Sequence, residues 1–109
     1  MATFGEEIRK ARIAKGLSLR EVAESITKDT EPGREPEQIS LQYLNDMEHG
    51  RRNPPSDKVI GQLAKKLDLK KDYLVFLAGR LPSDVRDARV SPEKVEKAFA
   101  AFRKDLRPR

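Results

Sequence analysis

The apolar and polar residues of this chain follow helical rather than strand periodicity. Apolar side chains recur three or four positions apart in a series of short runs, and nowhere do they alternate with polar ones for long enough to form a strand. Most runs begin just after a hydroxyl residue that can accept from a free backbone N–H at a helix N-terminus. These capping residues are Thr3, Ser18, Ser40, Ser56 and Ser91.

The pattern predicts an all-α fold of five helices with an additional C-terminal helix. Capping boxes are expected at Thr3 with Glu6 and at Ser18 with Glu21, because a Glu three residues after the cap can bond back to it. Gly16, Gly50 and Gly79 are natural helix stops. We expect a domain over residues 1–79, a linker over 80–90 and an amphipathic helix over 91–109.

A polar segment interrupts the pattern between the second and third predicted helices. Residues 27–38 read TKDTEPGREPEQ, with two prolines, one glycine and no apolar residue, which predicts a loop. Its acidic residues outnumber its basic ones, so phosphate binding by the whole loop is not expected. We interpret it as a solvent-exposed excursion that leaves the flanking helices in place; a role in specificity or partner binding is the alternative.

Composition narrows the function without deciding it. A chain of 109 residues with a formal net charge of +5 and a pI of about 9.6 suits one domain with a polyanionic partner. It has no Cys, a single His and no glycine-rich phosphate loop, so neither an enzyme nor a metal or cofactor site is expected. No apolar run is long enough to span a membrane and no secretory signal is visible, so we expect a cytoplasmic protein.

In this order the segments resemble the Cro and lambda-repressor type of helix-turn-helix protein, the XRE family. The resemblance covers roughly residues 4–79. It rests on RKARIAKGLSLREVA, which is similar to the family's first two helices, and on SLQYLNDMEHGRRNPPSDKVIGQLAKKLDL, which is similar to its recognition helix, turn and fourth helix. It implies a lambda-repressor-like fold that binds double-stranded DNA. It also implies an ion pair between Arg12 and Glu48, which would leave neither charge unpaired near the core.

The resemblance further implies a DNA surface built on the third helix and its flanks. The residues concerned are Arg20, Ser40, Leu41, Gln42, Tyr43, Asn45, Asp46, Arg51, Arg52 and Asn53. Gln42, and Asn45 if it reaches, can pair with adenine, while Leu41 can touch a thymine methyl. Arg20, Arg51 and Arg52 are suited to phosphate.

Other interpretations of these residues remain open. For Gln42 and Asn45 the alternative is an ordinary solvated position. For Tyr43 it is packing on a neighbouring element, and for Leu41 it is a protein-binding patch. Asp46 would repel phosphate unless it accepts from a cytosine or contacts a partner.

The C-terminal helix must cover an apolar stripe made of Val95, Phe99, Phe102 and Leu106. Pairing with a second copy is the favoured interpretation, because regulators of this family generally bind two-fold symmetric sites as dimers. Docking onto the same chain is the alternative. The sequence thus predicts a dimeric, sequence-specific regulator, most simply a repressor. The competing hypothesis is an antitoxin-like or adaptor protein whose helix-turn-helix mainly binds a protein partner.

Overall fold

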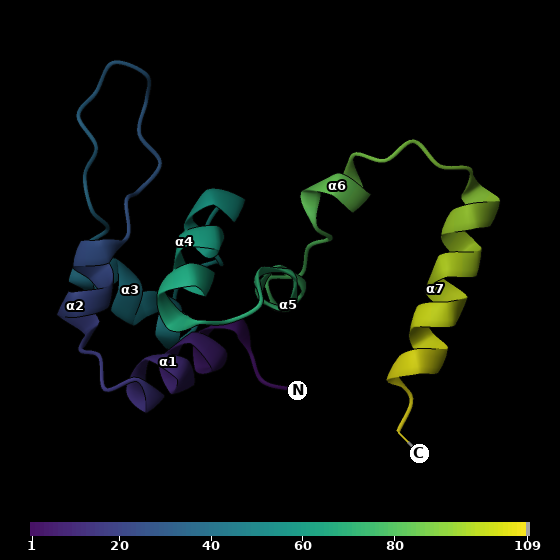
Figure 1. The fold of residues 1–109 in the computed structure, drawn as a ribbon, viewed down its shortest axis with the longest axis horizontal. Coiled ribbons are helices and arrows are strands. Elements are labelled where there is room, and N and C mark those ends of the chain that lie inside the picture. The colour runs from purple at the N-terminus through teal and green to yellow at the C-terminus, as the bar shows by residue number, and fades with distance from the viewer. Residues whose placement is uncertain (109) are drawn as a thin grey trace.

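The computed structural model describes residues 1–108, and all the regular structure in that range is helical (Figure 1). Arg109, the last residue of the predicted C-terminal segment, lies outside the described residues. The helices are α1 (Phe4–Ala14), α2 (Leu19–Ser25), α3 (Leu41–Glu48), α4 (Asp57–Leu67), α5 (Lys71–Leu77), α6 (Ser83–Arg86) and α7 (Pro92–Leu106).

Local capping places most helix starts. The hydroxyls of all five predicted caps accept from the backbone N–H three residues on. At Ser18 the capping box is complete, because the Glu21 side chain also accepts from the Ser18 N–H at 3.2 Å. At Thr3 the prediction of a capping box was only half right. The hydroxyl bond to the Glu6 N–H forms, whereas the exposed Glu6 side chain makes no return bond among the described residues.

Helices α1 to α5 enclose one hydrophobic core. Its side chains come from every one of these helices, and the most deeply buried include Ile8, Val22, Leu44, Ile60, Leu63 and Leu74. The approach of α1 to the end of α3 is close enough to require glycine. A Cβ at Gly5 would lie 2.6 Å from the carbonyl oxygen of Glu48, which no side chain tolerates. The third helix is therefore held firmly from behind.

Residues 27–38 form a narrow hairpin that rises away from α2 and α3 (Figure 1). Thr27 and Gln38 make an isolated antiparallel bridge, and the Lys28 N–H donates to the Glu37 carbonyl at 2.9 Å. Gln62 of α4 clamps the base, since it accepts from the Thr27 N–H at 2.7 Å and donates to the Thr27 carbonyl at 2.8 Å. Because the chain leaves and returns side by side, α2 and α3 still pack against each other.

The predicted linker contains the short helix α6, which the sequence analysis did not anticipate. Two arginines tie this segment to the start of α4. Arg80 Nη1 lies 3.1 Å from one oxygen of Asp57 and Arg86 Nη2 lies 2.9 Å from the other. Arg80 also donates to the carbonyl of Pro54 at 3.0 Å.

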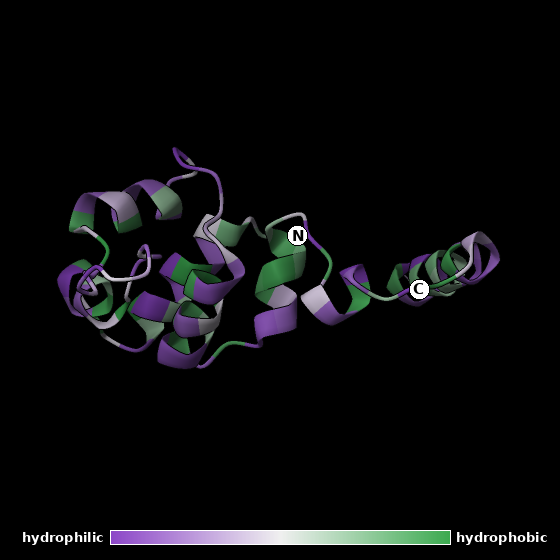
Figure 2. Cartoon of the chain, turned by 90° about the horizontal axis from the view of Figure 1, so that it is seen from above, coloured by the Kyte–Doolittle hydropathy of each residue, from purple (hydrophilic) through white to green (hydrophobic). Residues whose placement is uncertain are grey.

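Helix α7 stands apart from the five-helix core (Figures 1 and 2). One aromatic contact links it to α5, where the rings of Phe76 and Phe102 meet edge to face at 5.9 Å between centroids. No residue of α7 is buried. Figure 2 shows hydrophobic residues along α7. Within residues 1–108, no helix has the combined length and apolar character needed to cross a membrane.

Candidate nucleic-acid interface

Helix α3 is fastened to α1 by an ion pair at its C-terminal end. Arg12 Nε and Nη2 donate to the two carboxylate oxygens of Glu48 at 2.7 and 3.0 Å, a bidentate geometry. The Glu48 side chain is 1% exposed and that of Arg12 is 12% exposed. The bond to Glu48 raises the pKa of Arg12 above its ordinary value. Arg12 Nη1 also donates to the Leu17 carbonyl at 2.9 Å, so one guanidinium fixes both α3 and the turn before α2.

The outer face of α3 is exposed and mainly polar. The Ser40 hydroxyl accepts from the Tyr43 N–H at 3.0 Å and starts the helix. Leu41 and Gln42 are exposed, whereas Asn45 is half-buried. Leu44 and Met47 point inward and anchor the helix in the core. An eight-residue helix with this division of faces can present polar groups to a groove while its back stays fixed.

Asp46 is held by two neighbours, which the sequence analysis did not foresee. One of its oxygens accepts from Gln42 Nε2 at 2.9 Å and from Arg51 Nε at 3.1 Å. The Arg51 bond is the main cause that lowers the pKa of Asp46, and the Gln42 bond and the charges of Arg51 and Arg52 add to it. The negative charge of Asp46 is thus compensated by neighbouring side chains of the protein itself.

Tyr43 and the turn after α3 form a second contact. Tyr43 packs partly against the core, and the Arg52 guanidinium lies over its ring at 5.4 Å from the centroid. The Tyr43 ring therefore packs within the protein, as one of the two interpretations has it. Contact of Tyr43 with DNA stays a prediction. His49 Nδ1 lies 2.8 Å from the Asn45 carbonyl at the helix C-terminus.

Exposed arginines lie on α2, which packs against α3, and in the turn that follows α3. Arg20 lies near the start of α2; its side chain is 73% exposed, with Glu24 3.9 Å away. Arg51, Arg52 and Asn53 follow α3 and are exposed.

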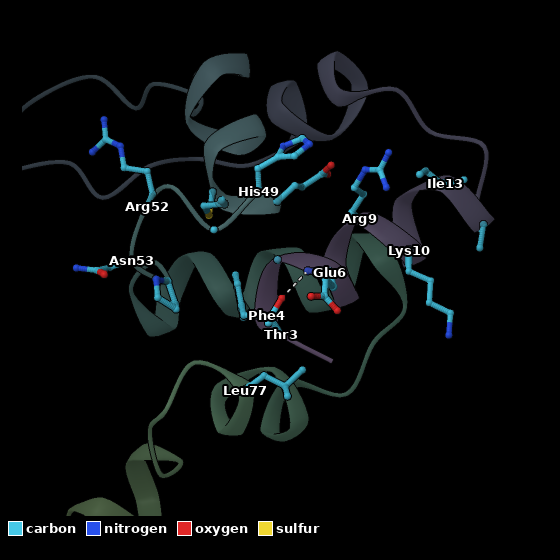
Figure 3. A pocket seen from close by; sticks show the side chains of 16 residues that line it. Thr3, Phe4, Glu6, Arg9, Lys10, Ile13, His49, Arg52, Asn53 and Leu77 are labelled. Atoms are coloured by element: carbon cyan, nitrogen blue, oxygen red, sulfur yellow. Dashed lines mark hydrogen bonds between the residues drawn. The ribbon is translucent and has the colours of Figure 1, made fainter. Parts of the chain in front are cut away.

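A shallow cleft of about 990 Å³ lies behind this turn, between α1 and residues 47–54 (Figure 3). Its lining includes Arg9, Lys10, His49 and Arg52. In Figure 3, Lys10 and Arg52 point away from each other, so they do not converge on one ligand. Residues 1–108 contain no group of His, Cys, Asp and Glu side chains suited to a metal ion.

The structure adds four polar residues that sequence reasoning missed. They are Asp57, Gln62, Arg80 and Arg86. Their partners lie 23 to 35 residues away along the chain, beyond the reach of periodicity. The Gln42 to Asp46 bond did carry a signal, because residues four apart on a helix are neighbours.

Helix α3 is short, packs against α2 and is held to α1 by the Arg12–Glu48 pair. Its outer face is polar and arginines follow it in the chain. These features define a helix-turn-helix DNA-binding protein. Comparison with known proteins agrees. The sequence profile of the helix-turn-helix domain matches residues 3–74. Transcriptional regulator ClgR of Mycobacterium tuberculosis, in strains CDC 1551 and H37Rv alike, is 32% identical over 89 residues, which is 81% of this chain and 69% of the relative.

A solved structure described as a SinR protein/SinI protein complex is also similar. It superposes with a TM-score of 0.52 at 25% identity and covers 95% of this chain and 100% of the matched one. The chain belongs to the XRE family of helix-turn-helix transcriptional regulators. The predicted family and the predicted all-α fold are thereby confirmed.

Proposed function

We propose that this DNA-binding regulator is a repressor that binds a two-fold symmetric operator as a homodimer. The observation that carries the proposal is the outer face of α3, where Leu41 and Gln42 are exposed. Exposed arginines accompany it, Arg20 on α2, which packs against α3, and Arg51 and Arg52 in the turn after α3. Such an arrangement suits a helix inserted in the major groove, with arginines on the phosphates at its edges. A bound dimer would occlude a promoter that overlaps its operator.

The residues of this surface have distinct proposed tasks. Gln42 reads a base through its amide, Asn45 reads a second if it reaches the groove, and Leu41 contacts a thymine methyl. Ser40 leaves the first amides of α3 free to face a phosphate. The phosphate contacts belong to Arg20, Arg51, Arg52, Asn53 and, through its hydroxyl, Tyr43. These contacts position the helix and carry no sequence information themselves.

The homodimer is proposed to form through α7. Val95, Phe99, Phe102 and Leu106 are 37 to 60% exposed in the single chain, which leaves an apolar stripe with little cover. Val95, Phe99 and Phe102 line one side of an apolar groove. Leu81, Val85 and Val90, from the linker and α6, line it as well. Tyr73, itself 40% exposed, extends the apolar surface onto α5. Exposed apolar surface of this kind marks protein interfaces, and a second copy supplies a matching stripe.

Selection of bound duplexes from a random library tests this function. We expect an enriched, two-fold symmetric motif, and fluorescence anisotropy on that duplex should show affinity falling steeply with salt as phosphate contacts release counterions. Gln42→Ala should relax one base pair in each half-site. Glu35→Ala on the exposed hairpin is the matched control and should leave the motif intact. Weak binding without enrichment would contradict the proposal.

One observation favours a second candidate function, the antitoxin-like or adaptor protein. The matched SinR chain was solved in complex with SinI, another protein. Leu41, the first residue of α3, is 40% exposed on the proposed DNA surface and would suit a protein contact there. Leu41→Ser separates the candidates, because it should weaken binding to the selected duplex only if α3 is the DNA-reading helix. Two results together would favour the protein-binding function. The Leu41→Ser variant would keep full DNA affinity, and the DNA affinity of the wild type would not change with salt concentration.

A further inference from the structure

Asp46 occupies an unexpected place for an acid, on the helix proposed to enter the DNA groove. Its side chain is only 18% exposed although Arg51, which covers it, is 58% exposed. Three bonds build this corner. The Asp46 carbonyl accepts from the Arg51 N–H at 2.8 Å, and one carboxylate oxygen accepts from both Arg51 Nε and Gln42 Nε2.

The bond to Asp46 determines which way the Gln42 amide faces. A side-chain amide has a donor end and an acceptor end, whereas a carboxylate only accepts. The nitrogen of Gln42 must therefore face Asp46, and the amide oxygen faces away from it. The second N–H of the same nitrogen stays available. An outward oxygen beside an N–H is the combination that pairs with N6 and N7 of adenine.

The same carboxylate also orients Arg51. Asp46 engages the Nε–H, which leaves the N–H groups of the two terminal nitrogens free. Those groups form the fork that binds a phosphate. One carboxylate thus holds a base-reading side chain and a phosphate-binding side chain in fixed relation, before DNA arrives. Ordering these side chains in advance lowers the entropy lost on binding.

We propose that Asp46 is a positioning residue for sequence readout, which fixes the Gln42 amide for an adenine and Arg51 for the adjoining phosphate. The inference rests on the proposed DNA-reading role of α3. It makes a prediction opposite to simple electrostatics: loss of this acid, although it removes a negative charge that faces phosphate, weakens binding to the preferred sequence and reduces specificity.

The test compares four proteins on duplexes selected by the wild type. They are the wild type, Gln42→Ala, Asp46→Ala and the double variant. Each is measured by anisotropy on the preferred duplex and on the three duplexes that change the Gln42-dependent base pair. The wild type should discriminate by about 10-fold or more, as a bidentate amide–adenine pair does. Asp46→Ala should reduce that ratio to about 2-fold, and the double variant should lose no more than Gln42→Ala alone.

Two controls separate positioning from charge and from folding. Asp46→Asn keeps one oxygen that can accept from Gln42, but its amide can also donate to Gln42, so it should recover only part of the base preference that Asp46→Ala loses. Glu35→Ala removes one negative charge elsewhere and should leave the preference unchanged. Melting curves by circular dichroism should show Asp46→Ala folded at the assay temperature; if it is not, the Asp46→Asn and Asp46→Leu pair gives the comparison.

The outcomes differ for each way of being wrong. Tighter binding of Asp46→Ala to all four duplexes by one common factor would show that Asp46 is only a repulsive charge. A change of preference at a base pair that Gln42→Ala does not affect would show that Asp46 reads a base directly. Either result overturns the inference about Asp46 but not the proposed function of the protein. A wild type that selects no sequence overturns the proposed function and the inference with it.

Discussion

At the scale of residues, the Arg12–Glu48 pair joins α1 to α3 through a nearly buried charge. A nearly buried carboxylate is tolerable only because both its oxygens accept from one guanidinium. The same arginine bonds the Leu17 carbonyl, so it holds the first turn of the motif as well as the third helix. Arg12 therefore contributes both to the stability of the fold and to the position of α3, beside the core packing of Leu44 and Met47.

Arg12→Ala is expected to destabilise the fold by about 3–5 kcal/mol, because it leaves Glu48 charged and buried without a partner. Chemical denaturation followed by circular dichroism measures the free energy of unfolding. Arg9→Ala, an exposed position on the same helix, should change it by less than about 0.5 kcal/mol. Equal stability of the Arg12→Ala variant and the wild type would show that the pair has no stabilising role.

What the sequence could tell about single residues depended on how local the interaction is. Ser18, Ser40, Ser56 and Ser91 were predictable as caps, because a cap bonds a backbone N–H three residues away. The Arg12 and Glu48 positions came from family resemblance alone, since 36 residues separate them. The DNA-contact residues remain predictions. For Asp46, the charge and the Gln42 neighbour four residues earlier are visible in the sequence, but the bond to Arg51 is not.

At the scale of elements, the contact of Asp57 with Arg80 and Arg86 attaches the linker and α6 to the start of α4. Arg80 also reaches Pro54, in the turn that carries Arg51 and Arg52. The segment before α7 is thus attached beside the turn proposed to bind phosphate. The linker was predicted from Pro82 and its charged neighbours, yet nothing in its sequence showed that two of those charges pair across 23 and 29 residues.

This contact should weaken in acid. The bonds from Arg86 and then Arg80 lower the pKa of Asp57 below its ordinary value of 3.8. A carboxylate whose pKa is lowered in the folded state stabilises the fold at every pH above its ordinary pKa. This contribution is lost as the pH falls through the pKa of the folded state. We expect the stability difference between the wild type and Asp57→Asn to be full at pH 7 and to disappear in strong acid.

Urea denaturation of both proteins from pH 7 down to pH 2.5 measures this difference. Other carboxylates titrate in the same range, but they are present in both proteins and largely cancel. Hydrogen exchange at α6 provides an independent readout, since the hydrogen-bonded amides 85–88 should exchange faster in Asp57→Asn at neutral pH. A difference that stays constant over the whole pH range would rule out this role of the Asp57 charge.

The hairpin at residues 27–38 shows the other limit of prediction at this scale. Its Pro and Gly content correctly excluded a helix, and its lack of apolar residues correctly predicted exposure. The clamp by Gln62 could not be predicted, because the glutamine lies on α4, 35 residues away. That clamp explains how an insertion between the two helices of the motif leaves their packing undisturbed.

At the scale of the whole molecule, the question is what covers α7. Its apolar residues remain partly exposed in the single chain, and one edge-to-face contact with Phe76 links it to the core. The sequence predicted both the helix and its stripe, but a pattern of apolar residues cannot distinguish docking from pairing. The proposed dimer makes α7 the element that sets the distance between two copies of α3.

Phe99→Asp should break the proposed dimer, because it places a charge in the middle of the apolar stripe without removing the Phe76–Phe102 contact. Sedimentation at tens of micromolar should show a dimer for the wild type and a monomer for the variant. Affinity for a full operator should fall about 100-fold or more, as the two half-sites are no longer bound together. Glu96→Ala, next to the stripe on α7, is the control. A wild type that sediments as a monomer would contradict the dimer.

The contact of Arg52 with the Tyr43 ring has a spectroscopic consequence. The chain contains two tyrosines and no tryptophan, so its near-ultraviolet emission comes from Tyr43 and Tyr73 alone. Tyr43 lies under Arg52 on the proposed DNA surface, and Tyr73 lies on α5, where it is 40% exposed. With Tyr73 replaced by Phe, the remaining tyrosine emission comes from α3, so an unlabelled protein would report whether the Arg52–Tyr43 contact changes when the proposed DNA surface is occupied.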